Sequence, residues 1–226
     1  MNDTIQERLQ AYLLEQGASD VGFSMPPDAG EEFPGLPYAV SIVLRLSDAI
    51  VDEIQGEPTH TYFNHYRSVN FCMDQLLLKA GMFLQKEGWR YITVAASQSI
   101  NQGGWNYQGR YSHKKAAVLA GLGTVGKSSL FLHRQWGPRV RLGTLFTDCP
   151  FTAPETLPAS LCGECRRCVQ ACPAGAITGR TWEPGLPREL LFDPAKCSNH
   201  MKRAYQHIGR GAVCGICMQV CPQGRK

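Results

Sequence analysis

Eight of the ten cysteines in this chain of 226 residues have the types and spacing of iron–sulfur ligands. The first run is Cys162-x2-Cys165-x2-Cys168-x3-Cys172-Pro173. The second is Cys214-x2-Cys217-x3-Cys221-Pro222, and Cys197 lies seventeen residues upstream of it. The first run has the spacing of bacterial two-cluster ferredoxins, in which the fourth cysteine ligates the other cluster. The sequence therefore predicts two [4Fe–4S] clusters and the transfer of single electrons.

The pairing of these cysteines follows from the shape of a cubane cluster, which needs four thiolates. A Cys-x2-Cys-x2-Cys segment supplies three of them, and the fourth must come from elsewhere in the chain. The simplest pairing assigns to the first cluster Cys162, Cys165, Cys168 and Cys221. It assigns to the second cluster Cys172, Cys214, Cys217 and, by elimination, Cys197, because Gly211 stands where a second run would begin. We interpret Cys72 and Cys149, outside the pattern, as buried free thiols.

Two other uses of cysteine are weaker explanations of the pattern. A disulfide scaffold is typical of small secreted chains, whereas this sequence begins with a polar, amphipathic segment and no export signal. A pair of zinc sites would use two Cys-x2-Cys pairs without the longer run that ends in Cys-Pro. Oxygen-sensitive clusters and free thiols predict a cytoplasmic protein. No stretch approaches the ~20 apolar residues of a membrane span, so we expect no membrane partner.

Composition indicates a globular protein and gives no reason to expect nucleic-acid binding. The hydrophobic share is 43%, and the first 155 residues are enough for a core of their own. The formal net charge is +4. Each cluster with its four thiolates carries a charge of about −2, so two clusters cancel this excess. The loaded protein is therefore expected to be nearly neutral.

The residues before the cysteine runs predict helices alternating with strands. Thr4 and Glu7 form a capping-box pattern at the start of a helix that Gly17 ends. We predict further helices over 61–85 and 112–120, and strands over 20–24, 38–46, 91–96 and 139–147. In the long helix the expected core side chains are Phe63, Tyr66, Phe71, Leu77, Phe83 and Leu84. This order predicts an α/β or α+β layer domain, with the polar segment 97–109 lining a site.

A glycine-rich motif, Gly121-x-Gly123-x-x-Gly126-Lys127-Ser128, matches the patterns of both phosphate-binding and dinucleotide-binding loops. Either fold needs a helix and further strands after the motif. Here Gly137-Pro138 interrupts the chain ten residues after Lys127, and only 35 residues lie between Gly126 and Cys162. We therefore favour a turn whose backbone approaches a large ligand closely.

The glycine motif and the cysteine runs, in this order, resemble those of the epoxyqueuosine reductase family. The resemblance runs from about Asn106 to Lys226 and includes Ala120–Lys127, Gly137, Leu142-Gly143, Thr147-Asp148, Lys196-Cys197 and Cys221-Pro222. Residues 1–105 resemble the family only in pattern. Reductive dehalogenases share the same plan, but they are typically exported, and this sequence begins without an export signal.

The resemblance implies an α+β fold in which a nitroreductase-like, cobalamin-binding domain over residues 1–155 precedes a dicluster ferredoxin-like domain over 156–226. It implies that the clusters hand electrons to cobalt, and that the cobalamin lies against the turn formed by Gly121, Gly123, Gly126 and Lys127. Ser112, His113 and Lys114 lie just upstream, where they could contact the corrinoid amides or, for His113, approach the cobalt. The alternative is a solvated helix N-terminus.

Two departures from the family bear on function. Its members carry an Asp as proton donor fourteen residues before the first glycine of the turn, where this sequence has Tyr107. Reductive dehalogenases use a Tyr donor, so Tyr107 is a candidate for the same role. Family members often continue into helical repeats that help to bind tRNA, and this sequence ends five residues after Cys221, so a tRNA substrate is doubtful.

These features favour a cobalamin-dependent reductase that acts on a small molecule or a modified nucleoside. It would receive electrons from a donor such as ferredoxin or flavodoxin. The alternative is an electron-transfer protein that reduces a corrinoid on a partner. A plain ferredoxin-type carrier would leave residues 1–155 unexplained.

Overall fold

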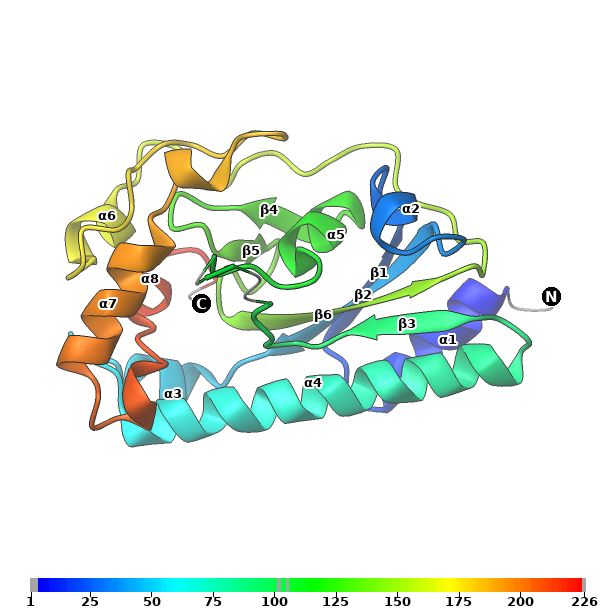
Figure 1. Ribbon diagram of the computed structural model, residues 1–226, viewed down its shortest axis with the longest axis horizontal. Coiled ribbons are helices and arrows are strands. Elements are labelled where there is room, and N and C mark those ends of the chain that lie inside the picture. Colours follow the sequence, from blue (N-terminus) through cyan, green and yellow to red (C-terminus); the bar gives the residue numbers. More distant parts are fainter. Residues whose placement is uncertain (1–3, 101–102, 105, 225–226) are drawn as a thin grey trace. The chain divides into compact units, whose positions relative to one another are not determined.

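A computed structural model of the chain describes residues 4–100, 103–104 and 106–224 (Figure 1). The chain forms two compact units. Unit 1 contains residues 1–45, 69–123 and 141–158, and unit 2 contains residues 46–68, 124–140 and 159–226. The units are therefore not consecutive in sequence, because two earlier segments belong to the same unit as the cysteine runs. The expected boundary between residues 155 and 156 stays a prediction.

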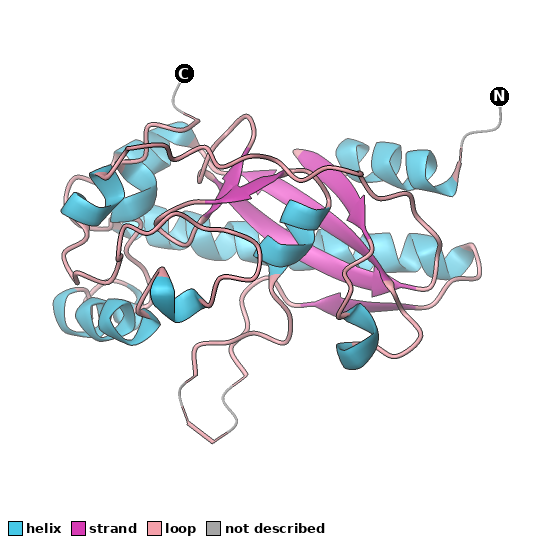
Figure 2. Ribbon diagram, turned by 90° about the horizontal axis from the view of Figure 1, so that it is seen from above, coloured by secondary structure: helices cyan, strands magenta, loops and turns pink. Residues whose placement is uncertain are grey.

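Unit 1 is built on a four-stranded sheet with the strand order β1-β2-β6-β3 (Figure 2). The strands are β1 (Asp20–Ser24), β2 (Tyr38–Arg45), β3 (Tyr91–Val94) and β6 (Val140–Thr147). β1 and β2 are antiparallel, with Gly22 opposite Ser41, and β3 and β6 are antiparallel, with Thr93 opposite Leu145. All four strands were predicted from their apolar, β-branched composition, with ends displaced by two residues or fewer.

Three shorter helices of unit 1 are α1 (Ile5–Glu15), α2 (Ala29–Glu32) and α5 (His113–Leu119). The predicted capping box starts α1, because the Thr4 side chain accepts from the Glu7 N–H and the Glu7 carboxylate accepts from the Thr4 N–H. The chain leaves the helix through Gly17, whose φ of 102° favours glycine.

The long helix α4 (His60–Lys86) supplies much of the core of unit 1 (Figure 1). Its buried side chains recur at helical spacing, and they are Met73, Leu76, Leu77, Ala80 and Leu84. A Cβ on Gly143 of β6 would lie 2.6 Å from the Met73 sulfur, so the absence of a side chain there lets the helix pack on the strand.

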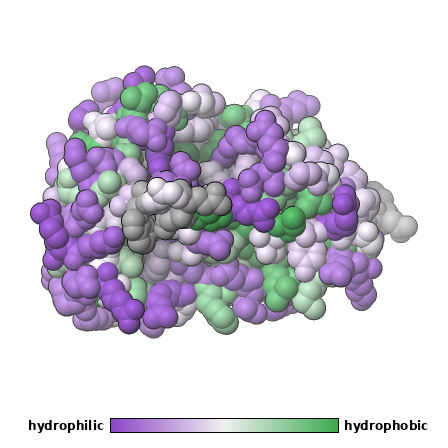
Figure 3. All heavy atoms as spheres, in the orientation of Figure 1, coloured by the Kyte–Doolittle hydropathy of each residue, from purple (hydrophilic) through white to green (hydrophobic). Residues whose placement is uncertain are grey.

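Two predictions for α4 are wrong. Phe71 is 66% exposed, and Cys72 is exposed as well. Phe71 lies on the face of the helix opposite the buried positions and Cys72 lies at its flank, so their apolar character did not indicate their orientation. Figure 3 shows a largely hydrophilic face with separate apolar patches. Cys149, by contrast, is fully buried as predicted.

Unit 2 consists of short elements. They are α3 (Asp48–Asp52), the first residues of α4, β4 (Gly123–Val125), β5 (Phe131–His133), α6 (Arg167–Ala171), η1 (Arg188–Leu190), α7 (Pro194–Ala204), η2 (Gly209–Gly211) and α8 (Ile216–Gln219). β4 and β5 form a two-stranded sheet, and α8 packs against both α6 and α3. The buried Arg139 guanidinium donates to Asp48 Oδ1 at 3.0 Å and to Asp52 Oδ1 at 2.6 Å. This pairing holds α3 in the unit.

Among the described residues, no helix is both long enough and apolar enough to cross a membrane.

Candidate iron–sulfur centres

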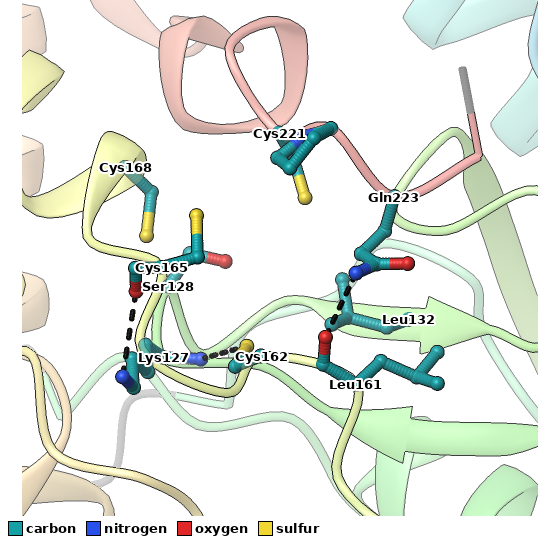
Figure 4. A pocket seen from close by; sticks show the side chains of 10 residues that line it. Lys127, Ser128, Leu132, Leu161, Cys162, Cys165, Cys168, Cys221 and Gln223 are labelled. Atoms are coloured by element: carbon teal, nitrogen blue, oxygen red, sulfur yellow. Dashed lines mark hydrogen bonds between the residues drawn. The ribbon is translucent and has the colours of Figure 1, made fainter.

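The first candidate centre is a pocket in unit 2 that four cysteine side chains share (Figure 4). Three of the cysteines come from the short run that leads into α6, and one follows α8, which packs against α6. The four are Cys162, Cys165, Cys168 and Cys221. The spacing predicted this same set for the first cluster, so the fold brings together two segments that are far apart in sequence.

The second candidate centre involves the other four cysteines, which influence one another electrostatically. Cys172 and Cys214 both act on Cys197, and these three act on Cys217 together with Cys168 of the first set. Cys172 directly follows α6, Cys197 lies in α7, Cys214 precedes α8 and Cys217 lies within it. The structure therefore brings the four residues near one another, and their assignment to one cluster stays a prediction.

The environment of these thiols suits a soft, positively charged group. Burial is the largest cause that raises the pKa of Cys221 to about 11 and that of Cys197 to about 11, and neighbouring cysteines add to it. Burial likewise raises the pKa of Cys217 far above its ordinary range. Such thiols lose their protons when a cation replaces them, which couples metal binding to proton release. Iron–sulfur clusters are among the groups that soft thiolate ligands select.

The number of cysteines suits two clusters. Among residues 4–100, 103–104 and 106–224, no group of three or more His, Cys, Asp or Glu side chains has an arrangement that holds a single metal ion. A cubane cluster takes four thiolate ligands. Two sets of four cysteines match that requirement, and the ligation of two clusters by these residues stays a prediction.

The end of the glycine motif lies against the first cysteine site. The Lys127 N–H donates to Cys162 Sγ at 3.4 Å, and the Lys127 ammonium donates to the carbonyl oxygens of Gly163 at 2.6 Å and Cys165 at 3.4 Å (Figure 4). A Cβ on Gly126 would lie 2.8 Å from Leu132 Cδ1 and 3.4 Å from Cys162 Sγ. Sequence reasoning had assigned both residues to the cobalamin and missed this contact, because no local signal links the motif to a cysteine 35 residues away.

The same motif lacks the helix that follows a phosphate-binding loop. Its middle residues form β4, a turn follows, and the chain continues directly into β5. Gly121 and Gly123 are in unit 1. Gly121 has a φ of 72°, and a Cβ there would lie 3.2 Å from the Pro154 ring, so only glycine suits this turn.

The histidine that precedes the motif is engaged within unit 1. The His113 ring links β6 to the residue after β3, with Nδ1 lying 2.9 Å from Thr144 Oγ1 and Nε2 lying 3.0 Å from the carbonyl oxygen of Ala95. Burial lowers its pKa, and the neutral ring fits a tautomer that donates from Nε2 to the carbonyl. Both ring nitrogens thus have partners within unit 1, and the role of His113 toward the cobalamin stays a prediction.

The neighbours of His113 are more accessible to a ligand. Ser112 is exposed and caps α5, where its Oγ accepts from the Lys115 N–H at 3.3 Å. A serine hydroxyl that accepts one bond still has a proton to donate. Lys114 is half-buried. A ligand role for these two residues stays a prediction.

Tyr107 is half-buried in the loop before α5 and has a φ of 53°, which is uncommon for a residue with a side chain. The Ile100 N–H donates to the carbonyl oxygen of Gln108 at 2.7 Å and closes this loop. Residues 101, 102 and 105 of the predicted lining segment lie outside the described residues. Backbone strain of this kind is common at functional sites. The proposed role of Tyr107 as a proton donor stays a prediction.

A polar cluster near α5 was not predicted. The Tyr111 hydroxyl donates to Asp28 Oδ1 at 2.8 Å, and the Lys115 ammonium pairs with Asp28 Oδ2 at 2.5 Å. Burial is the largest cause that raises the pKa of Tyr111 well above its ordinary range, and the hydrogen bond and charge of Asp28 add to it. Burial would raise the pKa of Asp28, but the bonds from Lys115 and Tyr111 outweigh it and lower that pKa. Tyr111 and Lys115 are four residues apart, but the residue that both of them bind, Asp28, is far away in sequence.

Comparison with known proteins agrees with this geometry. Residues 161–224 match the family described as a 4Fe-4S double cluster binding domain. An epoxyqueuosine reductase of Synechococcus sp. (strain RCC307) is 28% identical over 95% of this chain. This chain is similar to epoxyqueuosine reductases over nearly its whole length. An epoxyqueuosine reductase of Listeria monocytogenes is 32% identical over 52% of the chain. The matched part of the chain spans 64% of the Synechococcus protein and 31% of the Listeria protein.

Solved structures show the same fold. A crystal structure of an epoxyqueuosine reductase has a TM-score of 0.65 at 20% identity, covering 97% of this chain and 65% of the other. A catabolic reductive dehalogenase has a TM-score of 0.76 at 21% identity, covering 97% of this chain and 32% of the other. A further reductive dehalogenase structure has a TM-score of 0.74 at 21% identity, covering 97% of this chain and 32% of the other. That structure suggests a mechanism for B12-dependent dehalogenation.

Proposed function

We propose that this protein is an iron–sulfur oxidoreductase. Two [4Fe–4S] clusters in unit 2 would carry electrons to a cobalamin bound by the same chain, for reductive chemistry on a small molecule or a modified nucleoside. The observation that supports this most strongly is the division of eight cysteines into two sets of four. The similarity to epoxyqueuosine reductases also extends upstream of the cysteines, to residues that a simple carrier would not need.

The residues that the sequence analysis places beside a cobalamin divide into two groups. Ser112, Lys114 and Gly121 have polar or backbone groups that suit corrinoid amides, and they fit the proposal. His113 and Lys127 have other partners, as described above, and they are not assigned to the cofactor. When bound, cobalamin supplies low-valent cobalt as the reductant or nucleophile, and the protein supplies position and a proton.

Tyr107 is the proposed source of that proton. Its hydroxyl would donate a proton to the reduced substrate from a half-buried position. A Tyr107→Phe variant should bind the cofactor normally and lose turnover by about 100-fold, within the range that a general acid contributes. Unchanged turnover would exclude the role.

The main test is anaerobic reconstitution with iron, sulfide and hydroxocobalamin, followed by gel filtration, UV–visible spectroscopy and EPR. We expect one corrinoid per chain and a cobalt signal that decreases when the clusters are reduced. A chain without the clusters, prepared from a variant lacking all eight ligands, should show no such electron transfer. Failure to retain any corrinoid would contradict the proposal.

A second candidate is an electron-transfer protein that reduces a corrinoid held by a partner. His113, Gly126 and Lys127 contact other groups of the protein. These contacts favour the second candidate, because they leave fewer groups to bind a cofactor. Under this alternative the reduced protein would transfer electrons to a corrinoid protein without retaining corrinoid itself.

The electron donor and the substrate can each be identified by comparing the turnover of candidate compounds. We propose a ferredoxin or a flavodoxin as donor. One epoxyqueuosine reductase structure contains a modified tRNA stem loop, so a stem loop and the free nucleoside should be compared as substrates for this chain. A preference for the free compound would support the expectation that tRNA is not bound.

A further inference from the structure

Lys127 is a cationic side chain buried beside the first cysteine site. It is 6% exposed, and it lines the pocket that Cys162 and Cys165 also line. Its ammonium donates to the carbonyl oxygens of Gly163 and Cys165, which are neutral acceptors. In the part of the chain that the structure describes, no carboxylate pairs with it.

A buried ammonium without a counter-charge is unfavourable, because the protein interior does not replace its hydration fully. The breaking of a buried ion pair is strongly destabilising for the same reason. A [4Fe–4S] cluster with four thiolates carries a charge of about −2, and this site is predicted to hold one. The cluster would therefore be the counter-charge of Lys127.

The backbone of Lys127 adds a second contact to the same site. Its N–H donates to Cys162 Sγ at 3.4 Å, while its side chain binds the loop that carries Cys162 and Cys165. Hydrogen bonds to cluster sulfurs and nearby charge are among the factors that set reduction potentials. A fixed positive charge favours the reduced, more negative state of a cluster.

The lysine and arginine side chains of α7, the helix that carries Cys197 of the second site, are exposed. The cation nearest in sequence to Cys197 is Lys196, whose side chain is 64% exposed and lies 3.9 Å from Asp193. Lys202 and Arg203, in the last turn of α7, are exposed too. Water and salt screen charges at the surface much more than buried ones.

We propose that Lys127 raises the reduction potential of the first cluster above that of the second, so that an electron arriving from the donor resides on the first cluster. This inference rests on the two clusters of the proposed function. The step is a one-electron reduction, in which the donor is oxidised and no bond in the protein forms or breaks.

The test compares three variants by anaerobic redox titration with EPR detection. Lys127→Gln keeps a hydrogen-bond donor without the charge, Lys127→Met keeps the apolar stem, and Lys127→Arg keeps the charge. A Cys197→Ala background, in which the first cluster is expected to remain alone, assigns the signals. Iron and sulfide analysis reports whether each variant is loaded.

We expect Lys127→Gln and Lys127→Met to remain loaded and to lower the potential of the first cluster while the second stays unchanged. The expected size is at least a tenfold shift in the reduction equilibrium, which corresponds to about 59 mV for one electron. Lys127→Arg should retain most of the native potential.

Loaded variants with unchanged potentials would overturn the proposal, since the lysine would then only support the loop. Loss of the first cluster from both Lys127→Gln and Lys127→Met would also overturn it in favour of that structural role. The measurement needs neither cobalamin nor substrate, so a negative result leaves the proposed function standing.

Discussion

The two cysteine sites have the same ligand chemistry but different surroundings. The first combines three cysteines of a short run with Cys221, and the β4–β5 turn adds the cation of Lys127 and the compact Gly126. The second combines Cys197 and Cys217, which lie in α7 and α8, with Cys172 and Cys214, which lie just outside α6 and α8. The difference suggests that the groups around each cluster, more than the ligands themselves, separate the two electronic roles.

The two sites also obtain their ligands differently, and Gly211 explains why. A cysteine at position 211 would complete a second short run like that of the first site. Gly211 has a φ of 68°, and a Cβ there would lie 2.6 Å from the Cα of Lys202. No side chain fits this position, so Cys197 from α7 takes its place. The Asp193 side chain caps α7 by accepting from the Lys196 N–H at 2.9 Å, which fixes the start of the helix that carries Cys197.

The largest effect is expected from Cys197→Ala, which removes one ligand of the second site only. Iron should fall from about eight to about four per chain, because one cubane cluster would be lost. Iron and sulfide analysis with EPR measures this. The exposed Cys72→Ala is the matched control and should keep the full content.

A rescue attempt extends this test. Gly211→Cys in the Cys197→Ala background should not restore the second cluster, because the backbone of Lys202 occupies the space that a side chain needs. Full iron in Cys197→Ala alone would show that the second set is assigned wrongly.

The next effect concerns the first site. Gly126→Ala adds a methyl group that meets Leu132 and approaches Cys162, so we expect a loss of about 1–3 kcal/mol in the free energy of unfolding, typical of overpacking. Denaturant unfolding under anaerobic conditions measures it, and iron analysis should show preferential loss of the first cluster.

The control for that change is Gly30→Ala, because no heavy atom lies within 4 Å of the added Cβ. It should leave both clusters and the free energy of unfolding nearly unchanged. Equal losses in the two variants would contradict the role assigned to Gly126 in closing the first site.

A smaller effect is expected from Gln223→Ala. The Gln223 side chain donates from Nε2 to the carbonyl oxygen of Leu161 at 2.8 Å, which ties the segment after Cys221 to the segment before Cys162 (Figure 4). Loss of this bond should lower the free energy of unfolding by about 0.5–1.5 kcal/mol. The exposed Gln55→Ala serves as control, and the comparison fails if both variants unfold alike.

The smallest expected effect concerns His113, and it distinguishes unit 1 from the cysteine sites of unit 2. Burial lowers the pKa of His113 from its usual 6.5, so the unfolded chain binds a proton more readily than the folded one. The stabilising contribution is complete above pH 6.5 and decreases as the pH falls toward the lowered pKa. Unfolding free energies at pH 7.5 and 5.5 should differ less in His113→Gln than in the native chain.

This pH dependence should persist in Cys197→Ala, because His113 belongs to unit 1 and the cysteine to unit 2. If the dependence disappears with the second cluster, acid acts on the cysteine sites and not on His113.

Local pattern predicted some parts of the fold well and others poorly. The strands and α1 follow from β-branched runs and a capping box, which act over a few neighbouring residues. The orientation of Phe71 and Cys72 did not follow, because both faces of α4 carry apolar side chains and only packing on the sheet selects one of them. The partners of His113 come from two other segments, so nothing near it in sequence indicated them.

The sequence by itself determined the ligand chemistry of this protein, because the spacing of thiolates around a cubane cluster is a local property of a short run. It also predicted the two sets of four, since the count left one assignment for Cys197. Only the tertiary structure decided which side chains surround each set. Lys127 reaches the first site through the turn between β4 and β5, and Gly211 excludes a ligand because the backbone of α7 passes close to it. Contacts of this kind depend on where distant segments meet, and no spacing within one segment specifies that.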